Sequence, residues 1–489
     1  MAGRSRDPSA SGRLRTRSGA AMLVLIALVA SATGATAAPL AAGGAPRTAA
    51  AQPAQAQASS DRWVYAPGAF PLGSGTVQMA PGPDGGLYVL AVDHGSVLAL
   101  LDARGRPRAG WPVANPAARC EEWMDPAWQP SWALIPASDG SVRVLCPVLD
   151  GVRAFAFDSR GRLLRGWPVD LPESIVGNDV RVVGTRFVAI VSEGTRRDPY
   201  EASTAAWWLV SVSADGTVRT GQRQEVLGAD WPGPIRLGPD GLAYGWDYGE
   251  GHEVAAFGLG GKVPGWPVRI GEHVDDVVFG PPGFADVIGS TPAGDRPRIR
   301  AFTSTGSEVQ TATVDLPVDV QRTWNGAGEG RAAVLLGADR SVWVLGERGA
   351  RTLVYALDRS GRIRHGWPYR VTPGLEWLGG GCPQWATGCG AGLSKPAVGP
   401  GNVLYLEVAA PSRRVGGSLT AIGPDGRVRS GWPVALRRPG AEFRAVVIGT
   451  DGTVFALATE PESADADSWT ILAVAPDSTV RWRMTAVDP

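Results

Sequence analysis

The sequence predicts an all-β protein built from repeated hairpins, and three observations support this prediction. First, Gly-Trp-Pro occurs five times, and a rare large aromatic between two backbone-restricting residues does not recur so often by chance. Second, the 489-residue chain has 66 Gly and 40 Pro, a composition that suits many turns and argues against a helix-rich enzyme. Third, no segment shows a sustained 3.6-residue periodicity, which excludes helical solenoids. The copies start at Gly110, Gly166, Gly265, Gly366 and Gly431.

Each Gly-Trp-Pro copy follows a predicted hairpin turn. In four copies the Trp comes six residues after a turn glycine, and an apolar run such as Val97–Leu101 precedes the turn. The turn aspartate can accept an N–H of its own loop, and the glycine tolerates positive φ. The proline after each Trp lacks an N–H, so we expect the strand to end there. The motif therefore predicts a strand, a tight turn and a second strand.

A second hairpin signal precedes the first in each unit, with the form Asp-Gly-x-apolar-aromatic, as in Asp240–Tyr244 and Asp451–Phe455. Each unit thus has four strands, A to D, with turns between A and B and between C and D. Three more units are degenerate: Gln222 and Ala312 stand where a Trp would, and Trp482 follows its turn at a shorter spacing. The C/D turns then fall about 53 residues apart, at residues 105, 161, 216, 261, 306, 361, 426 and 478.

Four short strands at this period are typical of a propeller blade. We therefore predict an eight-bladed β-propeller of four-stranded antiparallel blades over residues 61–489. Seven blades are the alternative, if one degenerate unit is an insertion. Two modes of ring closure stay open: Trp63-Val64-Tyr65 pairs with the terminal strand near Arg481-Trp482-Arg483, or it merely precedes blade 1.

The N-terminal residues read as an export signal and a linker. Five arginines precede the apolar run 20–30, and Ala35-Thr36-Ala37 offers a small-residue cleavage site, so residues 1–37 predict a signal peptide. A retained membrane anchor is the alternative, although the run is short for a bilayer span. Residues 38–60 are rich in Ala, Pro and Gln and predict a disordered linker. We expect a secreted or cell-envelope protein without a stable membrane span after cleavage.

Charge and cysteines give further bounds. The chain has 47 basic and 47 acidic residues, and removal of the signal leaves a net charge near −4, which gives no basic footprint for nucleic acid. All four Cys lie in the exported part. Cys120 with Cys146, and Cys382 with Cys389, fall in connections on one propeller face, so we expect two disulfides, each worth about 2–4 kcal/mol. A metal site is the rival interpretation, but no nearby His completes a tetrahedral set.

The segment Ala356–Gly361 with its following Trp resembles the tryptophan-docking repeat of pyrroloquinoline-quinone-type eight-bladed propellers. In that family a tryptophan packs between blades against the turn region. The resemblance implies the same role for Trp111, Trp167, Trp266, Trp367 and Trp432. Here the Trp lies two residues further from the Gly and is followed by Pro, a variant more similar to exported FG-GAP-type repeats. The resemblance therefore implies the propeller fold rather than quinone chemistry.

Six of the tryptophans outside the repeat are candidate ligand-binding residues. They fall in D-to-A connections, which emerge on one face, and rigid aromatic projections on loops suit recognition. They could equally fold back and plug the central channel. Three acidic residues of the connection that enters blade 2 are added to the candidates. The full set is Trp123, Trp128, Trp231, Trp324, Trp377, Trp385, Glu121, Glu122 and Asp125.

These features favour a non-enzymatic recognition or scaffold module whose partner is an exported protein or a cell-wall glycan. No cofactor, metal site or catalytic residue is predicted. The first alternative is a dehydrogenase of sugars or alcohols that uses pyrroloquinoline quinone with calcium, as the resemblance would allow. A carbohydrate-active enzyme is a weaker alternative, based on acids beside aromatics in 120–125 and 246–253. The four scattered histidines and the one-carboxylate Gly-Pro-Asp-Gly turns do not favour catalysis or tight calcium binding.

Overall fold

The computed structural model divides the chain into two units, Met1–Ser60 and Asp61–Pro489, and all the residues described below belong to the second. The structure describes residues 76–93, 95–114, 133–148, 151–171, 174–192, 206–224, 235–246, 253–271, 273–279, 283–290, 297–314, 316, 333–337, 339–348, 351–371, 396–408, 415–463 and 466–485.

Eight antiparallel sheets follow one another along the chain, and each is built from consecutive strands. Blade 1 contains β1 (Thr76–Pro81), β2 (Leu87–Asp93), β3 (Gly95–Leu101) and β4 (Val113–Ala114). Blade 2 contains β5 (Ala133–Pro136), β6 (Val142–Val148), β7 (Gly151–Phe157) and β8 (Val169–Leu171). Blade 3 contains β9 (Ser174–Val183), β10 (Arg186–Ser192), β11 (Trp207–Val212) and β12 (Val218–Thr220). Blade 4 contains β13 (Ile235–Leu237), β14 (Ala243–Trp246), β15 (Glu253–Gly258), β16 (Gly261–Lys262) and β17 (Val268–Arg269).

The second half repeats this order. Blade 5 contains β18 (His273–Phe279), β19 (Phe284–Ser290), β20 (Pro297–Thr303) and β21 (Glu308–Thr313). Blade 6 contains β22 (Ala333–Leu336), β23 (Val342–Arg348), β24 (Arg351–Leu357) and β25 (Tyr369–Arg370). Blade 7 contains β26 (Ala397–Gly399), β27 (Val403–Val408), β28 (Ser418–Ile422) and β29 (Val434–Ala435). Blade 8 contains β30 (Glu442–Ile448), β31 (Val454–Ser463), β32 (Ala466–Val474) and β33 (Val480–Thr485), and the predicted eight-bladed all-β propeller is confirmed.

Among the described residues, the hydrophobic core forms eight clusters, one between each pair of neighbouring blades. Alternate residues of a strand point to opposite faces of its sheet, so one blade supplies side chains to two clusters. Leu87 and Leu101 of blade 1 pack with Phe455 and Ile471 of blade 8. Tyr88 and Leu100, one residue away on the same strands, pack with blade 2. The stability of a blade therefore depends on both of its neighbours.

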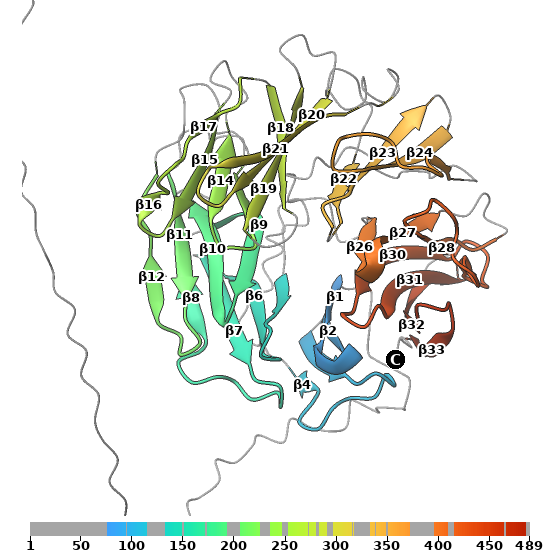
Figure 1. Cartoon of the computed structure of the whole chain (residues 1–489). Helices are drawn as coiled ribbons and strands as arrows, with labels where there is room; N and C mark the ends of the chain where they lie inside the picture. Colours follow the sequence, from blue (N-terminus) through green and yellow to red (C-terminus); the bar gives the residue numbers. More distant parts are fainter. Residues whose placement is uncertain are drawn as a thin grey trace, which may run out of the picture. The chain divides into compact units, whose positions relative to one another are not determined.

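The ring closes by packing between whole blades. Strand β1 contacts β30, which joins the first blade to the last (Figure 1, blue and red). Each of these two sheets takes its four strands from one continuous segment of the chain. Trp63-Val64-Tyr65, considered for closure on sequence grounds, lies outside the described residues.

The turns lie where the repeat places them. Seven of the eight turn positions are glycines with positive φ, and the eighth, Ser478, has φ of 73°. The expectation for the proline was wrong. In blade 1 the chain forms one bridge, Leu101 to Pro107, then passes through Gly-Trp-Pro, and the outer strand β4 starts only at Val113. All five Trp-Pro peptide bonds are cis. In the three degenerate units a strand starts two residues after the turn, at Val218, Glu308 and Val480, so Gly-Trp-Pro displaces the outer strand.

Candidate functional site

The connections between strands divide the propeller into two faces. In an antiparallel four-stranded blade the A/B and C/D turns emerge at one end, here called the turn face. The B-to-C and D-to-A connections emerge at the other end, the loop face. The A/B and C/D connections range from residues 184–185 to residues 102–112, whereas the D-to-A connections range from residues 172–173 to residues 371–396. The lengths of the connections therefore vary more on the loop face than on the turn face.

The loop-face candidates lie outside the described residues. This holds for all nine ligand-binding candidates, Trp123, Trp128, Trp231, Trp324, Trp377, Trp385, Glu121, Glu122 and Asp125. It also holds for Cys120, Cys382 and Cys389, so both disulfides stay predictions. Cys146 is fully buried on β6. In the second acidic segment, Trp246 is buried on β14 and Glu253 is exposed at the start of β15.

On the turn face, the five motif tryptophans lie between neighbouring blades. Each is 5–8% exposed. Each indole Nε1 donates a hydrogen bond to a main-chain carbonyl in the C/D turn of the next blade. The acceptors are Ser159 at 3.0 Å from Trp111, Ala214 at 3.0 Å from Trp167, Ser304 at 3.0 Å from Trp266, Pro424 at 3.2 Å from Trp367 and Pro476 at 3.3 Å from Trp432.

The glycine of each motif makes the same junction tight. A Cβ on Gly166 would lie 1.9 Å from the carbonyl oxygen of Asp215, in the next turn, and a Cβ on Gly216 would lie 2.2 Å from the carbonyl oxygen of Gly166. Equivalent close approaches occur at Gly110, Gly265 and Gly366. The two backbones can approach this closely only because the motif glycine, Gly166, and the turn glycine, Gly216, both lack a side chain.

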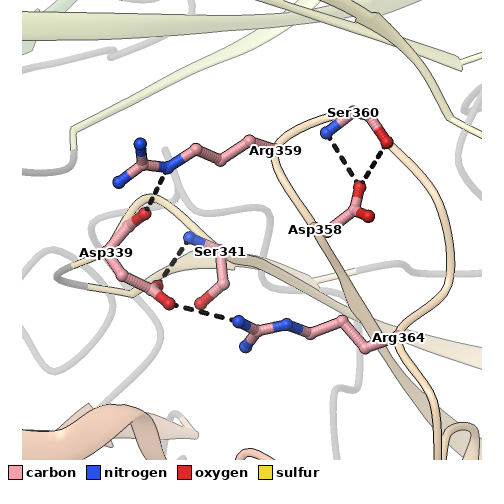
Figure 2. A pocket seen from close by; sticks show the side chains of 6 residues that line it. All are labelled: Asp339, Ser341, Asp358, Arg359, Ser360 and Arg364. Carbon is pink, nitrogen blue, oxygen red and sulfur yellow. Dashed lines mark hydrogen bonds and ion pairs between the residues drawn. The ribbon is translucent and has the colours of Figure 1, made fainter.

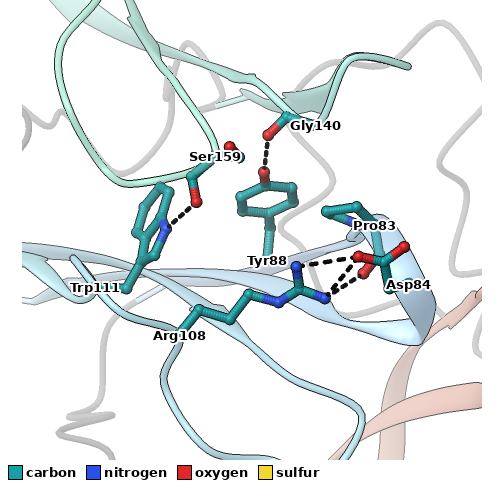
Figure 3. A network of polar contacts seen from close by, with 7 residues as sticks. All are labelled: Pro83, Asp84, Tyr88, Arg108, Trp111, Gly140 and Ser159. Carbon is teal, nitrogen blue, oxygen red and sulfur yellow. Dashed lines mark hydrogen bonds and ion pairs between the residues drawn. The ribbon is translucent and has the colours of Figure 1, made fainter.

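The contacts around Trp111 show how one unit is connected (Figure 3). The Tyr88 hydroxyl donates to the carbonyl of Gly140 in blade 2 at 2.6 Å, and the Tyr88 and Trp111 rings meet edge to face, 5.8 Å apart. Burial raises the pKa of Tyr88 to about 12, so the hydroxyl keeps its proton and can donate. Arg108 joins the C/D segment to the A/B turn through Pro83 O and Asp84 Oδ2. These contacts stabilise the scaffold.

A cavity of about 500 Å³ opens on the turn face of blade 6. Its lining comes from the A/B turn, with Asp339 and Ser341, and from the C/D segment, with Asp358, Arg359, Ser360 and Arg364 (Figure 2). Both arginine side chains reach Asp339: Arg359 Nε donates to its main-chain oxygen at 3.0 Å, and Arg364 Nη2 lies 3.3 Å from its Oδ2.

Both carboxylates of the cavity are held in the ionised form. Burial pushes the pKa of Asp339 upward, but the hydrogen bond from the main-chain N–H of Ser341 and the charge of Arg364 outweigh it, and the pKa lies below its ordinary value. The Ser360 hydroxyl lowers the pKa of Asp358, and main-chain N–H groups of the same turn add to this effect. The cavity therefore combines charged donors with carboxylates that are already engaged.

The cavity was not expected from the sequence, because residues 358–361 predict only a turn. One signal was available. The second residue of the C/D turn is Arg359 in blade 6, whereas the other blades carry a small or apolar residue there: Ala103, Ser159, Ala214, Leu259, Ser304, Pro424 and Pro476.

Within the part of the chain that the structure describes, no group of three or more His, Cys, Asp or Glu residues is placed to hold a metal ion. The same residues contain no helix long and apolar enough to cross a membrane.

Comparisons with known proteins give likenesses of fold only. No protein-family model matches the chain, so the resemblance to quinone-type repeats stays a prediction. No curated protein matches it either. A solved protein from Lactobacillus plantarum is 13% identical with a TM-score of 0.38, over 71% of this chain and 94% of that one. A protein of unknown function from Bacteroides caccae is 11% identical with a TM-score of 0.27, over 60% and 93%. Prolyl oligopeptidase B from Galerina marginata is 10% identical with a TM-score of 0.42, over 83% of this chain and 57% of that one. Likenesses of this size assign no activity to the chain.

Proposed function

We propose that this protein is an exported, non-enzymatic recognition or scaffold module that binds a protein or a glycan through its loop face. The observation that carries the proposal is the difference between the two faces. On the turn face, the C/D segments are engaged in contacts between blades, and the connections vary less in length than on the loop face. On the loop face, the D-to-A connections vary widely in length, and the longer ones hold the six candidate tryptophans. Variable loops on a rigid scaffold are where binding residues concentrate.

The aromatic content of these connections suits a polymer ligand. Indole rings offer flat surfaces on which sugar rings or protein side chains can pack, and aromatic residues dominate the energy of many interfaces. We also propose the disulfides Cys120–Cys146 and Cys382–Cys389, which would restrain the two Trp-bearing connections. Peptide mapping without reduction tests this pairing, and recovery of the four cysteines as free thiols would contradict it.

The binding proposal is tested with the double variant Trp123→Ala/Trp377→Ala. We expect retention on insoluble cell-wall glycan to fall by about tenfold or more, because aromatic anchors of interfaces often contribute about 2 kcal/mol or more each. Thermal unfolding measured on the same sample checks the fold. The matched control is Leu163→Ala, which removes an exposed apolar side chain from the turn face and should leave retention unchanged. Loss of stability with unchanged retention would instead show that these rings cap the central channel.

A further inference from the structure

The starting observation is that blade 6 leaves unpaired polar atoms where two other blades pair them. Blades 2, 6 and 8 share an A/B turn in which an aspartate precedes a hydroxyl residue by two positions. In each, the aspartate Oδ1 accepts the main-chain N–H of the hydroxyl residue, at 2.9 Å for Ser141, 2.8 Å for Ser341 and 2.9 Å for Thr453. The three turns are therefore directly comparable.

The hydroxyl groups of blades 2 and 8 are fully used. Ser141 Oγ donates to Asp139 and accepts from Arg143. Thr453 Oγ1 donates to Asp451 Oδ2 at 2.7 Å and accepts from Arg481 Nη1 at 2.6 Å. Ser341 in blade 6 is 2% exposed, lines the cavity, and its Oγ has no hydrogen-bond partner among the described residues. A buried hydroxyl without a partner is costly, so it indicates a group that the protein alone does not supply.

The arginine of blade 6 shows the same deficit. In blade 1 both Nη atoms of Arg108 have partners, and in blade 8 Arg481 Nη1 has two. In blade 6 Arg364 uses Nη2 on Asp339, whereas its buried Nη1 has no partner within the described part of the chain. The unpaired Nη1 and the unpaired Ser341 hydroxyl both belong to residues that line the same cavity.

The main chain at Gly337 lies close to the serine. A Cβ on Gly337 would lie 2.6 Å from Ser341 Oγ and 2.6 Å from Asn402 Oδ1, which is also buried and unpaired. The side-chain amide of Asn402 can present either its oxygen or its NH2 group in that position. Any residue larger than glycine at 337 would clash with these two side-chain oxygens.

Arg359 supplies the remaining donors. Its Nε is fixed on the carbonyl of Asp339, which holds the guanidinium beside the cavity (Figure 2). Among the described residues, no hydrogen bond engages its Nη1 or Nη2. Oδ1 of Asp358 accepts hydrogen bonds from Ser360 and from the N–H of Arg362, while none among the described residues reaches its Oδ2. The carboxylate of Asp339 accepts from Ser341 and Arg364. Free donors therefore outnumber free acceptors in the cavity.

We propose that this blade 6 cavity binds an oxyanion, the carboxylate or phosphate group of a small ligand, through Arg359, Arg364 and Ser341. Two guanidinium groups and a hydroxyl match the oxygens of such a group, because guanidinium can donate two parallel hydrogen bonds to it. The volume falls within the range of small-molecule sites. The site lies on the turn face, so it is separate from the proposed loop-face binding.

The test uses the full chain with inorganic phosphate in one arm and acetate in the other, against chloride at equal ionic strength. We expect at least one of the two anions to bind in calorimetry and to raise the midpoint of thermal unfolding. Arg359→Ala should weaken that binding about tenfold or more, because it removes charge-assisted hydrogen bonds. Arg160→Ala removes an exposed arginine from the C/D turn of blade 2 and should leave binding unchanged. Binding of phosphate alone, acetate alone or both identifies the ligand class.

A second pair of variants gives a readout that does not depend on ligand. Ser341→Ala removes an unpaired hydroxyl, so the unfolding midpoint without anion should stay the same or rise, while anion binding weakens. Ser141→Ala removes a paired hydroxyl and should lower the midpoint. The proposal is overturned if neither anion binds, or if Arg359→Ala binds as the natural chain does. The cavity would then hold water only.

Discussion

Five of the eight blade junctions share one tryptophan contact, and the other three replace it in three different ways. Between blades 3 and 4, the main-chain N–H of Gln222 donates to the carbonyl of Leu259 at 3.0 Å. Between blades 5 and 6, the side-chain amide of Gln310 donates to the carbonyl of Arg359. Leu259 and Arg359 are the turn residues equivalent to Ser159, so the constant feature is a donor for this carbonyl rather than an indole.

The closing junction is the exception. The ring of Trp482 in blade 8 packs on the turn of blade 1, where a Cβ on Gly105 would lie 2.7 Å from it, but its Nε1 has no partner among the described residues. Trp482 is also only partly buried. The closing junction therefore keeps the packing contribution of a tryptophan without its hydrogen bond. Ring packing and the indole hydrogen bond are therefore two separable contributions of the motif.

Replacing the junction tryptophan by Ala should have the greatest effect where the indole also donates a hydrogen bond to the next blade. We call the five junctions with that bond sealed junctions, in contrast to the closing junction. Trp432→Ala removes a buried ring and its hydrogen bond, and we expect the free energy of unfolding to fall by about 3–5 kcal/mol. Trp482→Ala should cost clearly less, because its ring is more exposed and no hydrogen bond is lost. Urea unfolding followed by tryptophan fluorescence and circular dichroism measures both variants. Equal costs would contradict the difference between the two junctions.

The next effect concerns the glycine of the motif. Gly166→Ala places a Cβ 1.9 Å from the carbonyl of Asp215 at a residue with φ of 83°, so the two blades must separate or the backbone must change. We expect a loss of about 1–3 kcal/mol or more. Gly260→Ala is the matched control, because no atom lies within 4 Å of its Cβ position and its φ is not in the left-handed region. If both variants unfold at the same urea concentration, the close approach has no energetic importance.

The blade number could be predicted because it depends on local features. Turn glycines, the preceding apolar runs and the Trp that follows all lie within one hairpin, so their spacing is visible along the chain. The effect of the proline was predicted wrongly for a physical reason. A proline cannot donate a hydrogen bond within a β-ladder, but this does not determine whether the strand lies before or after it in the sequence. Here β4 begins just after Pro112.

The junction contacts and the cavity could not be predicted, because they join residues distant in sequence. Gln310 and Arg359 meet across two blades, and nothing near Gln310 indicates that its amide replaces an indole. Ser341 is as ordinary in sequence as Ser141. Only the positions of their neighbours show that one hydroxyl is paired and the other is not.

The smallest effect isolates the hydrogen bond itself. Trp111→Phe and Trp482→Phe remove the same part of the ring, but only the first leaves a turn carbonyl, that of Ser159, without its donor. The second removes a buried N–H that has no partner, which offsets part of the lost packing. We expect Trp111→Phe to cost about 1 kcal/mol more than Trp482→Phe in urea unfolding. A difference near zero would show that ring packing alone holds the sealed junctions and that the indole N–H adds nothing to them.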